Sequence, residues 1–136
     1  MKKVIFFMIA ALLFGAKEAS AQADKIIGTY WSPQKDGKVE IFKQGNKYYG
    51  KIIWSSNPRK DAKNPKPELR SREIVGMTFL TDFKFDDDEY IDGEIYDPKS
   101  GKTYSCKMWL DGSYLHVKGY IGISLLGRTE KFERIN

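Results

Sequence analysis

Short runs of alternating apolar and polar residues, separated by turn sequences, fill most of the chain beyond residue 25. Successive side chains of a β-strand point to opposite faces, so this two-residue period indicates strands with one buried face. No stretch of ten or more residues shows a convincing 3.6-residue apolar repeat, the pattern of an amphipathic helix. The chain is therefore predicted to be an all-β protein.

Eight segments carry the strand pattern at close spacing. They comprise residues 26–31, 38–43, 47–54, 74–83, 89–96, 102–110, 113–120 and 127–135. Turn sequences such as Gly45-Asn46, residues 97–101 (DPKSG) and Asp111-Gly112 join consecutive segments and favour antiparallel hairpins. Consecutive antiparallel strands either close into a barrel or stack as a sandwich, and short turns favour the barrel. We predict a small eight-stranded antiparallel up-and-down β-barrel.

The first 21 residues have the features of a secretory signal. Lys2 and Lys3 precede an apolar run over residues 4–14, and the small residues Ala19-Ser20-Ala21 follow as a cleavage site. This run is too short for a membrane span, which needs about 20 apolar residues, and no span is expected elsewhere. Cleavage after Ala21 would leave residues 22–136 as a single domain of 115 residues. The expected location is the periplasm, or outside the cell.

The charge of the mature chain is weakly positive. Removal of the signal also removes Lys2, Lys3, Lys17 and Glu18, which leaves 20 basic and 17 acidic residues, a net charge of +3. Nucleic-acid binding normally depends on a dense basic patch, so no nucleic-acid partner is expected.

Few residues have the setting that catalysis or metal binding requires. Cys106 is the only cysteine, so no internal disulfide can form, and its place among inward-facing residues favours a buried, unreactive thiol. His116 is the only histidine, which excludes a His-based metal cluster. No serine lies in a Gly-x-Ser-x-Gly motif, and the acidic run 86–89 lacks the spacing of a calcium loop. We expect no metal, no cofactor and no enzymatic activity.

Alternation within the strands indicates which side chains face the barrel interior. This set comprises Val39, Ile41, Val75, Met77, Phe79, Ile91, Ile95, Tyr104, Met108, Leu110, Leu115 and Val117. An eight-stranded barrel either fills its interior with side chains or holds one small ligand, and both remain open. Arg128 and Glu130 share one side of the last strand. Facing inward they would form a buried charged pair that marks a polar ligand site, and facing outward they would be solvated.

One connection, residues 55–72, is much longer than the others and contains three prolines. Loops of this length are uncommon unless they are functional or disordered. Arg70 and Arg72 offer planar donors to a carboxylate or phosphate of a ligand. Alternatively, they pair with Glu68, Glu73 or Glu130 and pin the loop across one end of the barrel.

Several motifs together resemble a known family. They are GTYW (28–31), YGKIIW (49–54), DAKNPKPELR (61–70), GEIYDPKSGKTY (93–104), GYIG (119–122) and GRTE (127–130). In this order they resemble domain of unknown function family 2147, small secreted bacterial proteins with a lipocalin-like fold and no established ligand or reaction. Lipocalins carry Gly-x-Trp on the first strand, and a late Arg packs across that Trp. Here Tyr30 takes the Trp position with Trp31 after it, and the late Arg is either Arg128 or Arg134.

Three functions are compatible with these features. The first is a non-enzymatic carrier or sensor that binds a small amphipathic or hydrophobic envelope molecule inside the barrel. The second is an envelope protein-interaction module with a filled core and exposed Trp109, Tyr114 and Tyr120. The third, ranked last, is an enzyme with a carboxylate site at Asp61, Asp97 or Glu130. The candidate ligand-binding residues for the first function are Tyr30, Trp54, Arg70, Met77, Phe79, Tyr104, Met108, Arg128 and Glu130.

Overall fold

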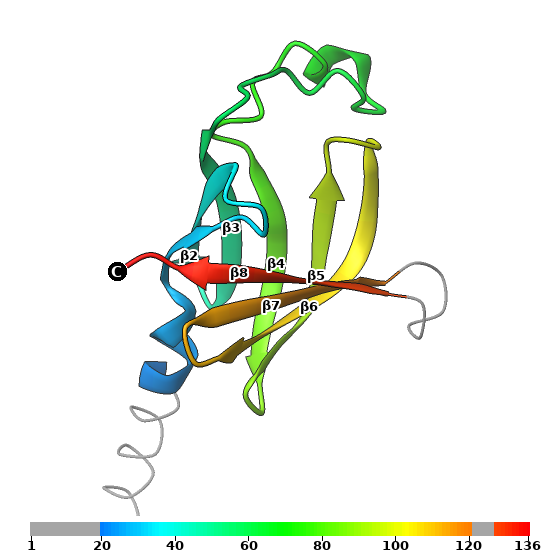
Figure 1. The fold of residues 1–136 in the computed structure, drawn as a ribbon. Helices are drawn as coiled ribbons and strands as arrows, with labels where there is room; N and C mark the ends of the chain where they lie inside the picture. The colour runs from blue at the N-terminus through cyan, green and yellow to red at the C-terminus, as the bar shows by residue number, and fades with distance from the viewer. Residues whose placement is uncertain (1–19, 121–126) are drawn as a thin grey trace, which may run out of the picture.

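Eight antiparallel strands, each paired with its neighbours in the sequence, form a closed barrel in the computed structural model, which describes residues 20–120 and 127–136 (Figure 1). The strands are β1 (Gly28–Trp31), β2 (Gly37–Gln44), β3 (Lys47–Ser55), β4 (Thr78–Asp86), β5 (Glu89–Asp97), β6 (Lys102–Asp111), β7 (Tyr114–Tyr120) and β8 (Arg128–Arg134). Two short 3₁₀ turns accompany them, η1 (Asp24–Ile26) and η2 (Pro67–Leu69). The predicted eight-stranded up-and-down barrel is confirmed. The predicted signal, residues 1–21, lies almost wholly outside the described residues.

The connections divide the barrel into two ends. The closed end carries η1 and the β2–β3, β4–β5 and β6–β7 turns, whereas the open end carries the β1–β2 and β5–β6 connections and the long one between β3 and β4 (Figure 1). Within the described ranges, no helix is long and apolar enough to cross a membrane.

Two strand predictions differ from the structure for reasons of backbone geometry. Residues 74–77 end the long connection instead of beginning β4, because Gly76 has a φ of +93° and the Met77 N–H closes a tight turn onto the Ile74 carbonyl, at 3.1 Å. In β5, Asp92 has a φ of +61° and the pairing with β6 shifts register between Tyr90 and Gly93. Ile91, predicted to face inward, is therefore only half-buried, whereas Tyr90 on its N-terminal side is fully buried.

The interior at the closed end is packed solid. Its fully buried side chains include Ile26, Tyr30, Ile41, Tyr48, Phe83, Tyr90, Met108 and Leu115. Packing here is close: a Cβ atom on Gly93 would lie 2.5 Å from the Phe83 ring, so this position accepts only glycine without a shift of Phe83. The filled interior that the sequence left open as one alternative thus exists in this half of the barrel.

Three tyrosines hold the N-terminal turn η1 against the closed end. The Tyr30 hydroxyl donates to the Ile26 carbonyl at 2.8 Å, and the Tyr48 hydroxyl donates to Asp24 Oδ1 at 2.5 Å. The Tyr90 hydroxyl donates to the Ala23 carbonyl. The rings of Tyr48 and Tyr90 also meet edge to face, with centroids 5.2 Å apart. Residues 23–26 therefore form the floor of the barrel.

The closing seam between β1 and β8 is short and depends on Arg134. Only Tyr30 with Arg134 and Trp31 with Glu133 pair across it. The Arg134 guanidinium lies over the Tyr30 ring, 5.2 Å from its centroid, and donates to the carbonyls of Lys25 and Ile27, the latter at 2.9 Å. The late arginine is thus Arg134 and the ring that it meets is Tyr30, whereas Arg128 lies at the other end of β8.

We expect Arg134→Met to destabilise the barrel by about 1–3 kcal/mol, because it leaves carbonyls at the seam without their donor. Urea unfolding measures this, with Lys131→Met, an exposed position on the same strand, as the control. Equal unfolding midpoints for the two variants would show that the seam does not depend on the guanidinium.

Candidate functional site

A cavity of about 390 Å³ opens at the end of the barrel opposite η1. Its inner wall is apolar and consists of Val39, Ile52, Ile74, Phe79, Ile95, Val117 and Phe132. Polar and charged side chains line it nearer the strand ends, where Trp54 is 42% exposed. The volume lies within the range of small-molecule sites, roughly 300–1,000 Å³. An apolar interior with a few polar groups is also typical of such sites.

Five of the nine candidate ligand-binding residues line this cavity: Trp54, Phe79, Tyr104, Arg128 and Glu130. They come from four different strands whose ends meet at the open end of the barrel.

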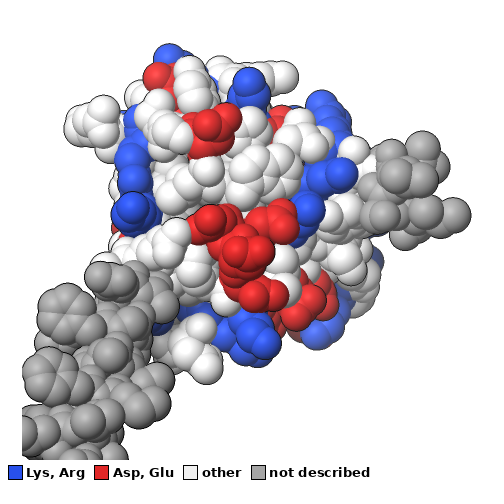
Figure 2. All heavy atoms as spheres, turned by 90° about the horizontal axis from the view of Figure 1, so that it is seen from below, with Lys and Arg blue, Asp and Glu red and all other residues white. Residues whose placement is uncertain are grey.

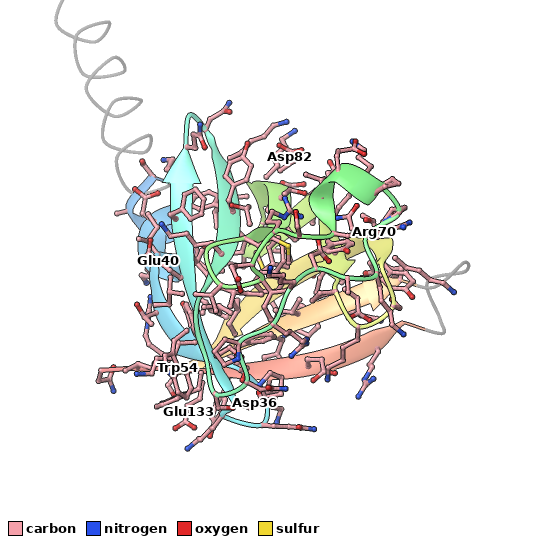
Figure 3. All side chains as sticks on the ribbon, turned by 90° about the horizontal axis from the view of Figure 1, so that it is seen from above. Asp36, Glu40, Trp54, Arg70, Asp82 and Glu133 are labelled. Atoms are coloured by element: carbon pink, nitrogen blue, oxygen red, sulfur yellow. The ribbon has the colours of Figure 1, made fainter. Side chains whose placement is uncertain are left out.

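The other four lie elsewhere. Tyr30 and Met108 are fully buried in the packed half of the barrel. Met77 is buried near the end of the long connection, where its sulfur lies 3.2 Å from Arg72 Nη2. Arg70 is exposed, and its Nε donates to the Asn64 carbonyl at 2.8 Å, so its side chain stabilises the long connection. In Figure 3, Arg70 lies on the far side of the open end from Trp54.

Two tryptophans and a lysine form a cluster beside the mouth, on the strand face opposite to inward-facing Val39. Trp31 and Trp54 meet edge to face with centroids 6.3 Å apart, and Lys38 pairs with both across the strands. The Lys38 ammonium lies 4.8 Å from the Trp31 ring centroid and 5.4 Å from that of Trp54. This cation–π arrangement holds a positive charge against an aromatic rim. Trp54 lies near Asp36 and Glu133 in the view from above (Figure 3).

Arg128 and Glu130 pair with each other at the mouth, with Arg128 Nε 2.8 Å from Glu130 Oε1. The Arg128 side chain is 82% exposed, so the two do not form a buried charged pair. Such an exposed pair contributes little to stability.

The long connection is fixed by Asp61, whose side chain is fully buried. Asp61 Oδ1 accepts a hydrogen bond from the Tyr96 hydroxyl at 2.6 Å, and Oδ2 accepts from Asn64 at 2.8 Å and from Arg72 at 3.0 Å. Arg72 therefore pins the connection, as one alternative predicted, but its partner is Asp61 rather than Glu68, Glu73 or Glu130. Because Tyr96 belongs to β5 and lines the cavity, the pin joins the connection to the cavity wall.

A second contact holds the same connection. Gly101, in the β5–β6 turn, has a φ of +74°, and a Cβ atom there would lie only 2.0 Å from the Lys63 carbonyl oxygen. The turn and the connection thus touch backbone to backbone. Viewed from above and from the side, the connection runs across the open end of the barrel (Figures 1 and 3).

The ionisation of Asp61 follows from these contacts. Burial raises the pKa of Asp61, but the hydrogen bonds from Tyr96, Asn64 and Arg72 outweigh it and hold the pKa below the usual value near 3.8. Burial, together with the bond to Asp61, raises the pKa of Tyr96 to about 12. The carboxylate is thus charged and the phenol neutral at neutral pH. A general acid needs the opposite shift at its carboxyl group.

Several residues of the cavity were not singled out from the sequence. Lys38, Arg59 and Tyr96 line it, and so does Gly119, beside Ile95 and Tyr104. One signal was available: in an up-and-down barrel, the end of β3, the end of β5 and the start of β8 must meet at the same end. Among the described residues, no three His, Cys, Asp or Glu side chains form a group that could hold a metal ion.

Replacement of Asp61 by Asn removes the charged acceptor and is expected to destabilise the protein by about 1–3 kcal/mol at pH 7. Because the folded pKa of Asp61 is lowered, its contribution is fully present above the unfolded pKa and is lost as the pH falls through the folded value. Urea unfolding should therefore show a smaller difference from wild type at pH 3 than at pH 7. Glu68→Gln, exposed on the same connection, is the control. A difference that grows in acid would contradict this role.

Comparison with known proteins agrees with this architecture. No curated protein matches the chain. Among solved structures, it is similar to protein HP1028 from the human pathogen Helicobacter pylori, described as belonging to the lipocalin family. The two share 26% sequence identity and superpose with a TM-score of 0.75 over 82% of this chain and 84% of that one. A family model matches residues 28–134, which run from the first residue of β1 to the last of β8. The chain therefore belongs to the family of uncharacterized proteins conserved in bacteria (DUF2147).

Proposed function

We propose that this protein is a non-enzymatic carrier or sensor that binds a small amphipathic or hydrophobic molecule in the cavity at the open end of its barrel. The observation that carries the proposal is the cavity itself, about 390 Å³, with apolar side chains inside and polar ones at the mouth. The likeness to a lipocalin-family protein supports it, because ligand binding inside the barrel is known for this fold.

The state of two reactive side chains, Cys106 and Asp61, also favours binding over catalysis. Burial raises the pKa of the Cys106 thiol to about 12, so it stays protonated at neutral pH and is a poor nucleophile. Asp61 is buried and bonded to three side chains of the protein. Neither group is free to act on a bound molecule.

The outer surface of the barrel supports ligand binding in the cavity over docking of a protein partner. A docking face would need a bare apolar patch. Trp109, Tyr114 and Tyr120 instead each have a lysine ammonium over the ring, at 5.7, 5.8 and 5.4 Å from the centroid. Trp109 also stacks on His116, with centroids 5.2 Å apart.

Gly119 offers a direct test of the cavity. A Cβ atom there would lie 3.4 Å from Ile95 Cγ2, an ordinary contact, so alanine fits and a larger side chain would extend into the cavity. The neutral dye N-phenyl-1-naphthylamine should bind wild type at one site. Gly119→Leu should weaken the affinity for the dye at least tenfold, or about 1.4 kcal/mol. Gly119→Ala should bind the dye as tightly as wild type does. Unchanged binding by Gly119→Leu, or no binding to wild type, would refute the proposal.

Export is part of the proposal and rests on the N-terminal sequence. We expect the protein isolated from the envelope to begin at Gln22. Where this terminal glutamine cyclises, the measured mass should be lower by that of one ammonia. Intact-mass measurement of the cell fractions checks this. A cytoplasmic protein that keeps residues 1–21 would contradict it.

A further inference from the structure

The acidic side chains at the cavity are already bonded within the protein. Asp36 Oδ1 accepts from Ser32 at 2.7 Å, Asp97 accepts from the Lys99 N–H at 2.9 Å and from Ser100 at 3.1 Å, and Glu130 pairs with Arg128 at 2.8 Å. Their negative charges are thus partly compensated and turned toward the protein's own donors.

One cation at the cavity differs from these acids. Arg59 lines the cavity and has no carboxylate within 4.0 Å among the residues that the structure describes. It is half-buried, so it has lost part of its hydration, whereas Lys99 also lines the cavity without such a partner but is exposed. The Lys38 ammonium lies over the Trp31 and Trp54 rings instead. A partly desolvated cation without a counter-ion gains free energy when an anion reaches it.

The Arg59 backbone is fixed, so the side chain starts from a defined place at the cavity. Its carbonyl accepts from the Ile74 N–H at 3.0 Å, and the adjacent Lys60 pairs with Glu73 in an isolated bridge. A guanidinium presents five N–H donors in a planar fork that suits the oxygens of a carboxylate or phosphate.

The distribution of charge over the molecule points the same way. Seen from below, Asp and Glu side chains gather near the middle of the closed end (Figure 2). An anion approaching the protein is therefore repelled at the closed end, whereas the open end has Arg59 at its cavity.

The volume sets the size of the molecule. One water-sized group occupies about 30 Å³ of liquid, so 390 Å³ holds roughly a dozen non-hydrogen atoms. The apolar wall suits a tail, and the mouth suits a head group.

On the basis of the proposed function, we infer that the ligand is an anionic amphiphile with a tail of about ten carbons. Arg59 binds its carboxylate or phosphate head. The tail lies among the apolar residues of the inner wall, such as Val39, Val117 and Phe132.

The test compares head groups on one tail. Decanoate, decyl phosphate and 1-decanol, each below its micellar concentration, compete with N-phenyl-1-naphthylamine for wild type. We expect decanoate or decyl phosphate to bind at least tenfold more tightly than 1-decanol, and the tighter of the two anions distinguishes a carboxylate from a phosphate ligand. Arg59→Met should abolish this preference while it still binds the dye and 1-decanol, and Arg59→Lys should retain part of it. Lys60→Met, the exposed neighbour, is the matched control.

The outcomes separate this inference from the function on which it rests. Equal affinity of wild type for decanoate, decyl phosphate and 1-decanol would overturn the anionic head group, and so would an unchanged preference in Arg59→Met. In both cases, binding of dye and 1-decanol would leave the carrier function standing. If wild type binds neither the dye nor any of the three ligands, the carrier function fails as well.

Discussion

Closure of the barrel depends on a short seam, where β1 and β8 share only two residue pairs and Arg134 meets Tyr30. The guanidinium covers the Tyr30 ring and bonds to the carbonyls of Lys25 and Ile27. One side chain thereby joins the last strand, the first strand and the turn before it. An open sheet of these strands would have two unpaired edges and no enclosed interior, so the packed half and the cavity both depend on this seam.

The two halves of the barrel interior are packed differently. Large aromatic side chains and η1 fill the closed end, where tyrosine hydroxyls satisfy backbone carbonyls that burial would otherwise leave without donors. The other end is hollow: Gly119 adds no side chain there, and the cavity wall combines aliphatic residues with aromatic ones such as Phe79 and Phe132. The fully buried tyrosines and Phe83 thus lie in the half of the barrel away from the cavity.

Alternation along the strands predicted most of the fold but only part of the candidate site. It shows which face of a strand a residue occupies but not its height along the barrel axis. Tyr104 and Met108 both belong to the inward face of β6, and only Tyr104 lines the cavity, because Met108 pairs with Tyr90 in the packed half. Among the arginines of the long connection, Arg70 was singled out and Arg59 was not. Which of them lines the cavity depends on how the connection folds over the mouth, and the strand pattern does not show this. The positive φ of Asp92, which turns Tyr90 inward, has no reliable signal in the sequence.

Tyr96 belongs at once to the wall of the cavity and to the hydrogen bonds that fix the long connection. A molecule that contacts its ring and favours the orientation that bonds Asp61 must stabilise the connection, and by thermodynamic reciprocity an ordered connection must favour that molecule. The exposed residues of the connection, Arg70 and Glu68 among them, lie on the outer surface. Under the proposed function, occupancy of the interior would thus be coupled to the outer surface of the connection through the bond between Tyr96 and Asp61.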